Sequence, residues 1–149
     1  MNVRKTAAVL SLLAAFAAGY FAGTQDDRSG VAYAQAQGSA RVFELRTYTA
    51  HPGRLDEVIA RFRDNTARIF AKNGITSVGY FTPQDAPLAG NTLVYILAHP
   101  SREAAKKNWD AFRNDPEWQK VKAATEANGP IVEKIVSVYL DPTNFSALK

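Results

Sequence analysis

The stretch RVFELRTYTAHPGRLDEV, from Arg41 to Val58, decides the fold of this chain. Its first half is rich in β-branched and aromatic residues, which favour a strand. Side chains along a strand point alternately to its two faces. Alternation therefore separates an apolar face from a mixed one: Phe43, Leu45, Thr47 and Thr49 against Val42, Glu44, Arg46 and Tyr48. We expect Phe43 and Leu45 to pack under helices, and we expect the mixed face to be covered as well.

The rest of the chain is divided by turn residues into alternating strands and helices. After Pro52-Gly53, apolar residues recur at the spacing of one helix face as far as Phe70. The pattern then predicts strands at residues 75–82 and 91–99, a helix capped by Ser101, a second helix begun by Asp115-Pro116, and a last strand at 131–140. This β-α-β-β-α-β order predicts an α+β, ferredoxin-like fold, with a four-stranded antiparallel sheet and helices on one face.

The inner strands are apolar on both faces, because Val94 and Ile96 alternate with Leu93, Tyr95 and Leu97. Helices on one side leave the second apolar face without a cover in its own chain. The simplest cover is a second copy packed across a two-fold axis, so we expect a homodimer. In that arrangement we expect the face of Glu44, Arg46 and Tyr48 to look into the barrel or its rim.

Four segments carry a resemblance to a known family: VFELRTYTAHPGRLDEV at 42–58, GYF at 79–81, NTLVYILAHPSREAAKKNW at 91–109 and DPEW at 115–118. Together they resemble a NIPSNAP domain over residues 42–142. The resemblance implies the dimeric α/β barrel fold, in which two ferredoxin-like units close one barrel. Most members have no established reaction, whereas the wider superfamily includes cofactor-independent monooxygenases and small isomerases.

The first 36 residues differ in composition from the rest. A basic head with Arg4 and Lys5 precedes the uncharged apolar run at 6–23, and A-x-A patterns follow at 32–36. This order is typical of an export signal. An uncleaved membrane anchor is the alternative, because the apolar run is near the lower length for spanning a bilayer. Both interpretations place the domain outside the cytoplasm, in the periplasm or the medium. We expect a linker at 37–41, the domain at 42–142 and a tail at 143–149.

Composition excludes several classes of chemistry. The chain has no cysteine, which removes disulfides, thiolate metal sites and a Cys nucleophile. Its net charge is +4, but basic and acidic residues are interleaved, so we expect no nucleic-acid partner. Two isolated histidines and no glycine-rich phosphate loop predict neither a metal site nor a cofactor. A single axial haem ligand, which His99 alone would supply, stays open.

Glu44, Arg46 and His99 are the candidates for chemistry. His99 is the natural acid or base because histidine alone titrates near neutral pH without perturbation. Glu44 is a candidate base, and Arg46 a candidate for holding a substrate carboxylate. The alternatives are a structural Glu44–Arg46 ion pair and a strand-end histidine that bonds the turn before Pro100. A buried charge requires a partner whether its role is catalytic or structural. Pairing of Glu44 with Arg46 therefore does not distinguish a catalytic site from a structural ion pair.

Large aromatic residues recur on the predicted strands and helices: Tyr48, Tyr80, Tyr95, Trp109 and Trp118. They are candidates for lining a cavity between sheet and helices, in the manner of small-molecule sites. The alternative is that they fill the core.

The sequence therefore leaves two functions open. The first is an exported homodimer that binds a small apolar ligand or a partner. The second is a cofactor-independent enzyme that uses His99. A cavity reaching His99 would favour the enzyme, and a space filled by Tyr95, Trp109 and Phe112 would favour binding or structure.

Overall fold

The computed structural model describes residues 41–149. Its elements follow in the order β1 (Val42–Ala50), α3 (Leu55–Arg61), η1 (Phe62–Thr66), α4 (Ala67–Lys72), β2 (Thr76–Phe81), β3 (Thr92–His99), α5 (Arg102–Asn114), α6 (Pro116–Thr125) and β4 (Val132–Leu140). The predicted signal or anchor lies outside the described residues. Within 41–149, no helix has the length and hydropathy needed to cross a membrane.

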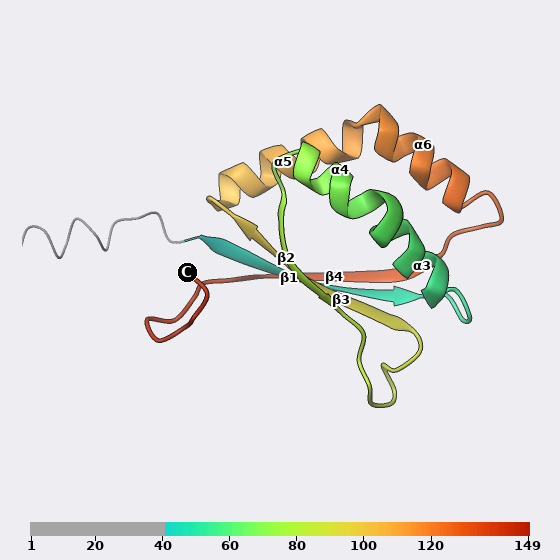
Figure 1. Cartoon of the computed structure of the whole chain (residues 1–149), viewed down its shortest axis with the longest axis horizontal. Coiled ribbons are helices and arrows are strands. Elements are labelled where there is room, and N and C mark those ends of the chain that lie inside the picture. The colour runs from blue at the N-terminus through green and yellow to red at the C-terminus, as the bar shows by residue number, and fades with distance from the viewer. Residues whose placement is uncertain (1–40) are drawn as a thin grey trace, which may run out of the picture. The chain divides into compact units, whose positions relative to one another are not determined.

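The four strands form one antiparallel sheet in the order β2-β3-β1-β4. Helices α3, α4, α5 and α6 lie on one side of this sheet, as Figure 1 shows. This confirms the predicted ferredoxin-like α+β fold. Strands β1 and β3 occupy the centre of the sheet. Side chains of these two strands that lie on the same face of the sheet therefore share the same cover.

The first helical segment contains a π-helical turn, η1, between two α-helical pieces. The Thr66 hydroxyl donates to the carbonyl of Arg61 five residues earlier, at 3.2 Å, inside this turn. A π turn is the usual form of a single extra residue within an α-helix. The predicted 3- and 4-residue spacing indicated one regular helix, and it did not reveal the turn. The helix ends at Asn73-Gly74, where Gly74 has a φ of +76°.

Predicted caps start the later helices. The Ser101 hydroxyl accepts a hydrogen bond from the Ala104 amide at 3.1 Å, which confirms it as the N-cap of α5. Asp115 caps α6 by accepting from the Glu117 amide at 2.9 Å, with Pro116 in the first turn. Asp115 also accepts from Asn73 at 2.8 Å, so this cap joins the two helical segments.

Aromatic rings fill most of the space between sheet and helices. Phe70 is the centre of this cluster, with ring centroids 5.4 Å from Trp109, 4.8 Å from Phe112 and 6.1 Å from Tyr95. Edge-to-face and tilted contacts of this kind add to the free energy of burial. The interior around Phe70 is therefore closely packed.

The predicted assignment of the two faces of β1 was wrong. The helices cover the face of Glu44, Arg46 and Tyr48, whereas Phe43 and Leu45 point to the open face. The mixed face is indeed covered, since Glu44 is only 1% exposed, but helices cover it and it does not look into a barrel. The physical reason is that partners on α5, β3 and β4 satisfy the charged groups. Burial then costs much less than an unpaired charge would.

The open face of the sheet is aliphatic. Leu45 pairs with Ile96 and Val138, and Thr47 pairs with Val94 and Val136. On β4, Val136, Val138 and Leu140 are between 41% and 47% exposed. Phe81 of β2 covers Gly79, since a side chain at Gly79 would meet the Phe81 ring at 2.8 Å.

Candidate functional site

The centre of the site is the buried carboxylate of Glu44, which accepts four hydrogen bonds. Its Oε2 accepts from His99 Nε2 at 3.0 Å and from Trp109 Nε1 at 2.7 Å. Its Oε1 accepts from Arg46 at 2.6 Å and from Ser137 Oγ at 2.6 Å. An ionised carboxylate has about four lone-pair sites, so these donors saturate it.

The hydrogen bonds decide the charge state of Glu44. Burial alone would raise the pKa of this carboxyl, but the hydrogen bonds from His99, Ser137, Trp109 and Arg46 outweigh it. They lower the pKa from 4.5 to about 2. Glu44 is therefore an anion at neutral pH. A saturated carboxylate with so low a pKa is a poor general base, because accepting a proton would require it to give up a donor.

His99 lies behind Glu44 and is fully buried. Because an ionised carboxylate only accepts, Nε2 of His99 carries the proton in this pair. Its Nδ1 is buried and has no hydrogen-bond partner within residues 41–149. His99 does not line either cleft described below, so one side chain separates its ring from the nearest ligand-accessible space.

Arg46 reaches from β1 toward α5. Its guanidinium lies over the Trp109 ring, with 4.3 Å from Cζ to the ring centroid, while it also donates to Glu44. The contact with Trp109 and the ion pair with Glu44 together fix the position of the guanidinium.

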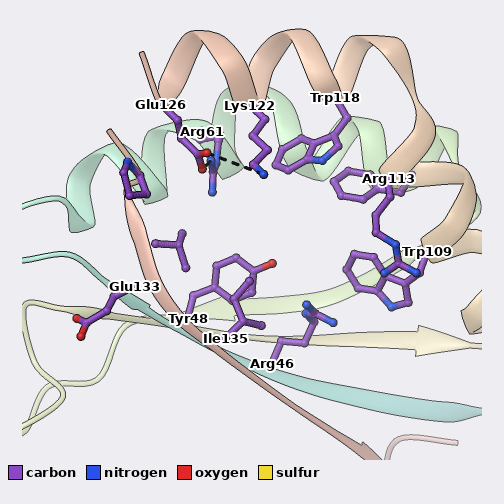
Figure 2. Close-up of a pocket in the computed structure, with 13 residues that line it drawn as sticks. Arg46, Tyr48, Arg61, Trp109, Arg113, Trp118, Lys122, Glu126, Glu133 and Ile135 are labelled. Atoms are coloured by element: carbon purple, nitrogen blue, oxygen red, sulfur yellow. Dashed lines mark hydrogen bonds and ion pairs between the residues drawn. The ribbon is translucent and has the colours of Figure 1, made fainter. Parts of the chain in front are cut away.

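The main cleft, of about 530 Å³, opens beside this arrangement, between the sheet and helices α5 and α6. Figure 2 shows Arg46, Tyr48 and Ile135 on the strand side, facing Arg61, Trp118 and Lys122 on the helix side. The rest of its lining is formed by Trp109, Phe112, Arg113, Glu126, Pro130, Val132 and Glu133. A cleft of this size suits a small organic molecule.

A second hollow, the side cleft, has a volume of about 490 Å³ and shares Arg46, Trp109 and Arg113 with the main cleft. It is lined further by Glu44, Arg102, Glu103, Lys106, Ser137 and Tyr139. Arg102 stacks on Tyr139, with 3.9 Å from Cζ to the ring centroid. The shared residues make Arg46 and Arg113 the side chains that a ligand in either cleft would meet.

The structure separates the predicted aromatic residues into two groups. Tyr48 and Trp109 line the main cleft, as does Trp118. Tyr95 is fully buried in the core, and burial raises the pKa of its hydroxyl, so it stays neutral at physiological pH. Tyr80 lines a separate apolar hollow of about 300 Å³ next to η1. Tyr80 and Tyr95 are therefore not brought to the main cleft.

Arg61, Arg113, Lys122 and Ser137 belong to the site but were not predicted from the sequence. Arg61 is 4% exposed, donates to Glu126 at 2.9 Å and lies over Trp118. A cation within the apolar stripe between Val58 and Phe62 is the signal that could have identified Arg61. Arg113 and Lys122 look like ordinary helix-surface cations in the sequence, and the pattern gives no signal for them.

No group of three or more His, Asp or Glu side chains capable of holding a metal is found among residues 41–149. Glu44 is instead occupied by arginine, tryptophan, histidine and serine donors, and Glu126 accepts from Arg61. The haem alternative would need His99, whose ring is buried and bonded to Glu44. The residues present therefore do not fit a haem ligand.

The fold defines the class of the protein: a ferredoxin-like α+β domain with a four-stranded antiparallel sheet. Residues 43–147 match the NIPSNAP family, and the chain belongs to that family. None of the curated proteins compared with the chain matches it.

Solved structures agree with this assignment. A NIPSNAP family protein of unknown function from Agrobacterium tumefaciens is 22% identical, with a TM-score of 0.66 over 76% of this chain and 97% of the other. A NIPSNAP-like protein from Burkholderia xenovorans is 22% identical, with a TM-score of 0.64 over 72% and 90%. A Streptomyces coelicolor monooxygenase bound to nanaomycin D is 15% identical, with a TM-score of 0.52 over 73% and 93%. At these identities the likeness shows the fold alone.

Proposed function

We propose that this chain is a homodimeric domain that binds a small, largely apolar ligand in the main cleft. The observation that carries the proposal is the cleft itself, whose aromatic walls are formed by Tyr48, Trp109, Phe112 and Trp118. The cleft has a volume of about 530 Å³ and combines these aromatic walls with charged side chains that converge on it. Apolar walls with polar groups that fix a ligand's orientation are typical of small-molecule sites.

The open face of the sheet supports the homodimer. Leu45, Val94 and Ile96 of the central strands lie beside the exposed Val136 and Val138 of β4. A continuous aliphatic face of this kind is rarely left in water. A second copy matches it in chemistry, and packing across a two-fold axis would cover both faces at once.

We also propose that the domain works outside the cytoplasm. The support is the basic head, apolar run and A-x-A patterns of residues 1–36. Export can be tested by measuring the mass of the chain in the periplasmic, medium, membrane and cytoplasmic fractions of its source cells. A shortened chain in a soluble exported fraction supports cleavage, a full-length chain in the membrane fraction supports the anchor, and a full-length chain in the cytoplasm contradicts export.

The contacts of Glu44 and His99 weigh against the alternative of a cofactor-independent enzyme. Glu44 is saturated by its four donors, and His99 is buried behind it. The size of the cleft supports the enzyme no more than it supports a binding protein. Fold similarity does not decide between them, because one fold hosts many functions.

Native mass spectrometry of the full chain purified from its source cells tests the binding function and the assembly together. We expect a dimer that carries a retained small molecule. Ile135→Trp, which fills the cleft from its floor, should remove the retained mass, whereas Ala123→Trp on the exposed face of α6 should keep it. A monomer contradicts the homodimer. A ligand that survives Ile135→Trp contradicts the cleft as its site.

A further inference from the structure

The charged side chains around the main cleft are predominantly basic. Four cations line it, and two acids: Arg46, Arg61, Arg113 and Lys122 against Glu126 and Glu133. The side cleft adds Arg102 and Lys106, with Glu44 and Glu103. A hollow with aromatic walls and an excess of cations attracts a ligand of negative charge.

Two of these acids are already occupied by cations of the lining. Glu44 accepts from Arg46, and Glu126 accepts from Arg61. Both of these cations are buried, because the Arg46 and Arg61 side chains are 14% and 3% exposed. The buried part of the cleft is thereby neutralised within the chain, and an anion would gain little by displacing these pairs.

Arg113 is different. It lines both clefts, its side chain is 60% exposed, and its partner Asp110 lies three residues earlier on α5 with 54% exposure. Exposed pairs of this kind contribute little free energy, so the guanidinium can leave Asp110 for a better acceptor at small cost. Figure 2 shows the Arg113 side chain extending from α5 toward Trp109 at one end of the cleft.

The apolar part of the lining has room for flat rings. Trp118 of α6 and Phe112 of α5 have ring centroids 4.5 Å apart, and both line the cleft. Figure 2 shows Trp118 across the cleft from Tyr48 and Ile135. An aromatic body would contact these walls, while a charged group at one end would meet Arg113.

We propose that the ligand of the main cleft is an amphipathic anion, with an aromatic body between Trp118 and Tyr48 and an anionic group bound by Arg113. This inference rests on the proposed binding function and adds the chemical class of the ligand and the residue that selects it. The guanidinium fork of arginine matches the geometry of a carboxylate or sulfonate, and a charge-assisted bond to it discriminates against neutral molecules of the same shape.

A matched pair of fluorescent dyes tests the proposal on the full chain. Anilinonaphthalene sulfonate is an aromatic anion, and N-phenylnaphthylamine has the same ring system without the sulfonate. Titration of each dye gives its Kd from the fluorescence rise in an apolar site. We expect the anionic dye to bind about tenfold more tightly than the neutral one, the ratio that one charge-assisted contact supplies.

Variants locate the contact. Arg113→Gln should weaken the anionic dye by about five- to tenfold and leave the neutral dye unchanged. Lys107→Gln is the matched control, because it removes one positive charge from the same helix at an exposed position outside both clefts. It should change neither dye, which separates a local contact from the attraction of a basic protein. Equal losses in the two variants would overturn the role of Arg113.

The two levels of the argument fail in different ways. If Ile135→Trp abolishes binding of both dyes while the unaltered chain binds them equally well, the cleft binds ligands and the anionic preference is overturned. If Ile135→Trp leaves both dyes bound, the cleft is not their site and the proposed binding function fails with the inference. Both the binding function and the anionic preference are supported by three results together. The unaltered chain binds the anionic dye more tightly, Arg113→Gln removes that difference in affinity, and Ile135→Trp abolishes binding of either dye.

Discussion

The helix-covered face of the sheet carries a buried ion pair, Glu44 with Arg46, whereas the open face is built mainly from valine, leucine and isoleucine. The charged face is the one that a single chain buries. Its charges are satisfied by donors of the same chain, so helices can cover it. No helix within residues 41–149 covers the aliphatic face, on which Val136 and Val138 stay exposed, and the proposed second copy would bury it. Polarity alone therefore does not tell which face of a sheet lies inside.

The largest expected effect is on assembly. Val138→Glu places a carboxylate on the open face, on the edge strand β4 beside Leu45, and a symmetric dimer packed on this face would bury it twice. We expect dimer dissociation to become more favourable by on the order of several kcal/mol, because a buried unpaired charge is costly. Analytical ultracentrifugation at micromolar concentration should then show a folded monomer. Ala111→Glu on the exposed side of α5 should leave the dimer intact. An unchanged dimer with Val138→Glu would show that another surface pairs the chains.

The next effect is on the stability of the covered face. Glu44→Gln should lower the free energy of unfolding by about 3 kcal/mol, because it leaves the Arg46 guanidinium buried without its counter-charge. Urea denaturation followed by tryptophan fluorescence measures the loss.

A double-mutant cycle with Arg46→Met isolates the pair. Arg46→Met should cost more when Glu44 is present than in the Glu44→Gln background, since only the first case leaves an unpaired buried carboxylate. Equal costs in both backgrounds would show that Glu44 and Arg46 do not depend on each other.

The same carboxylate predicts a pH dependence that the open face lacks. Its pKa is depressed from 4.5 to about 2, so its stabilising effect is complete above pH 4.5 and is lost as pH falls toward 2. Glu44→Gln removes this contribution, which amounts to roughly 3 kcal/mol. The stabilities of the two proteins should therefore differ at pH 7 and converge near pH 2. Unfolding curves that stay a constant distance apart over this range would contradict the assignment.

The smallest effect tests the contribution of β4 to the covered face. Ser137→Ala removes one of the four donors to Glu44 and should cost about 1 kcal/mol. The pKa of Glu44 should rise, which shifts the acid transition to higher pH. Ser137→Thr keeps the hydroxyl and should restore both values. An alanine variant that matches the unaltered protein would show that the hydroxyl does not reach the carboxylate in solution.

The fold could be predicted because its signals are local. Pro52-Gly53, Ser101 and Asp115-Pro116 mark element ends through their own backbone preferences, and the structure places those ends within a residue or two of the prediction. The cover of each face of β1 could not be predicted in the same way. It depends on Trp109 and Ser137, which bond Glu44 from 65 and 93 residues away.

The candidate site shows the same division. Arg46, Tyr48 and Trp109 were named as candidates from their chemistry, and all three line the main cleft. Their meeting was not predicted, because the face of Arg46 and Tyr48 was expected to look into a barrel and not toward the helices. His99 was predicted from its chemistry, but whether a side chain reaches a cleft depends on what packs in front of it. In this case Glu44 does. Arg113 and Lys122 were missed because they line the same cleft only through the way in which α5 and α6 pack against the sheet, and the sequence pattern does not show that packing.

The π-helical turn at residues 62–66 has a consequence for how the length of this chain can vary. Such a turn holds one residue more than an α-helix needs, so losing a residue between Phe62 and Thr66 would leave a regular helix. Ile69 and Phe70 would keep their direction toward the core. A deletion within the regular helix α5 would instead turn everything beyond it by about 100° and carry the cleft residues away from the sheet. Insertions and deletions among relatives should therefore gather at the π turn and be absent from α5.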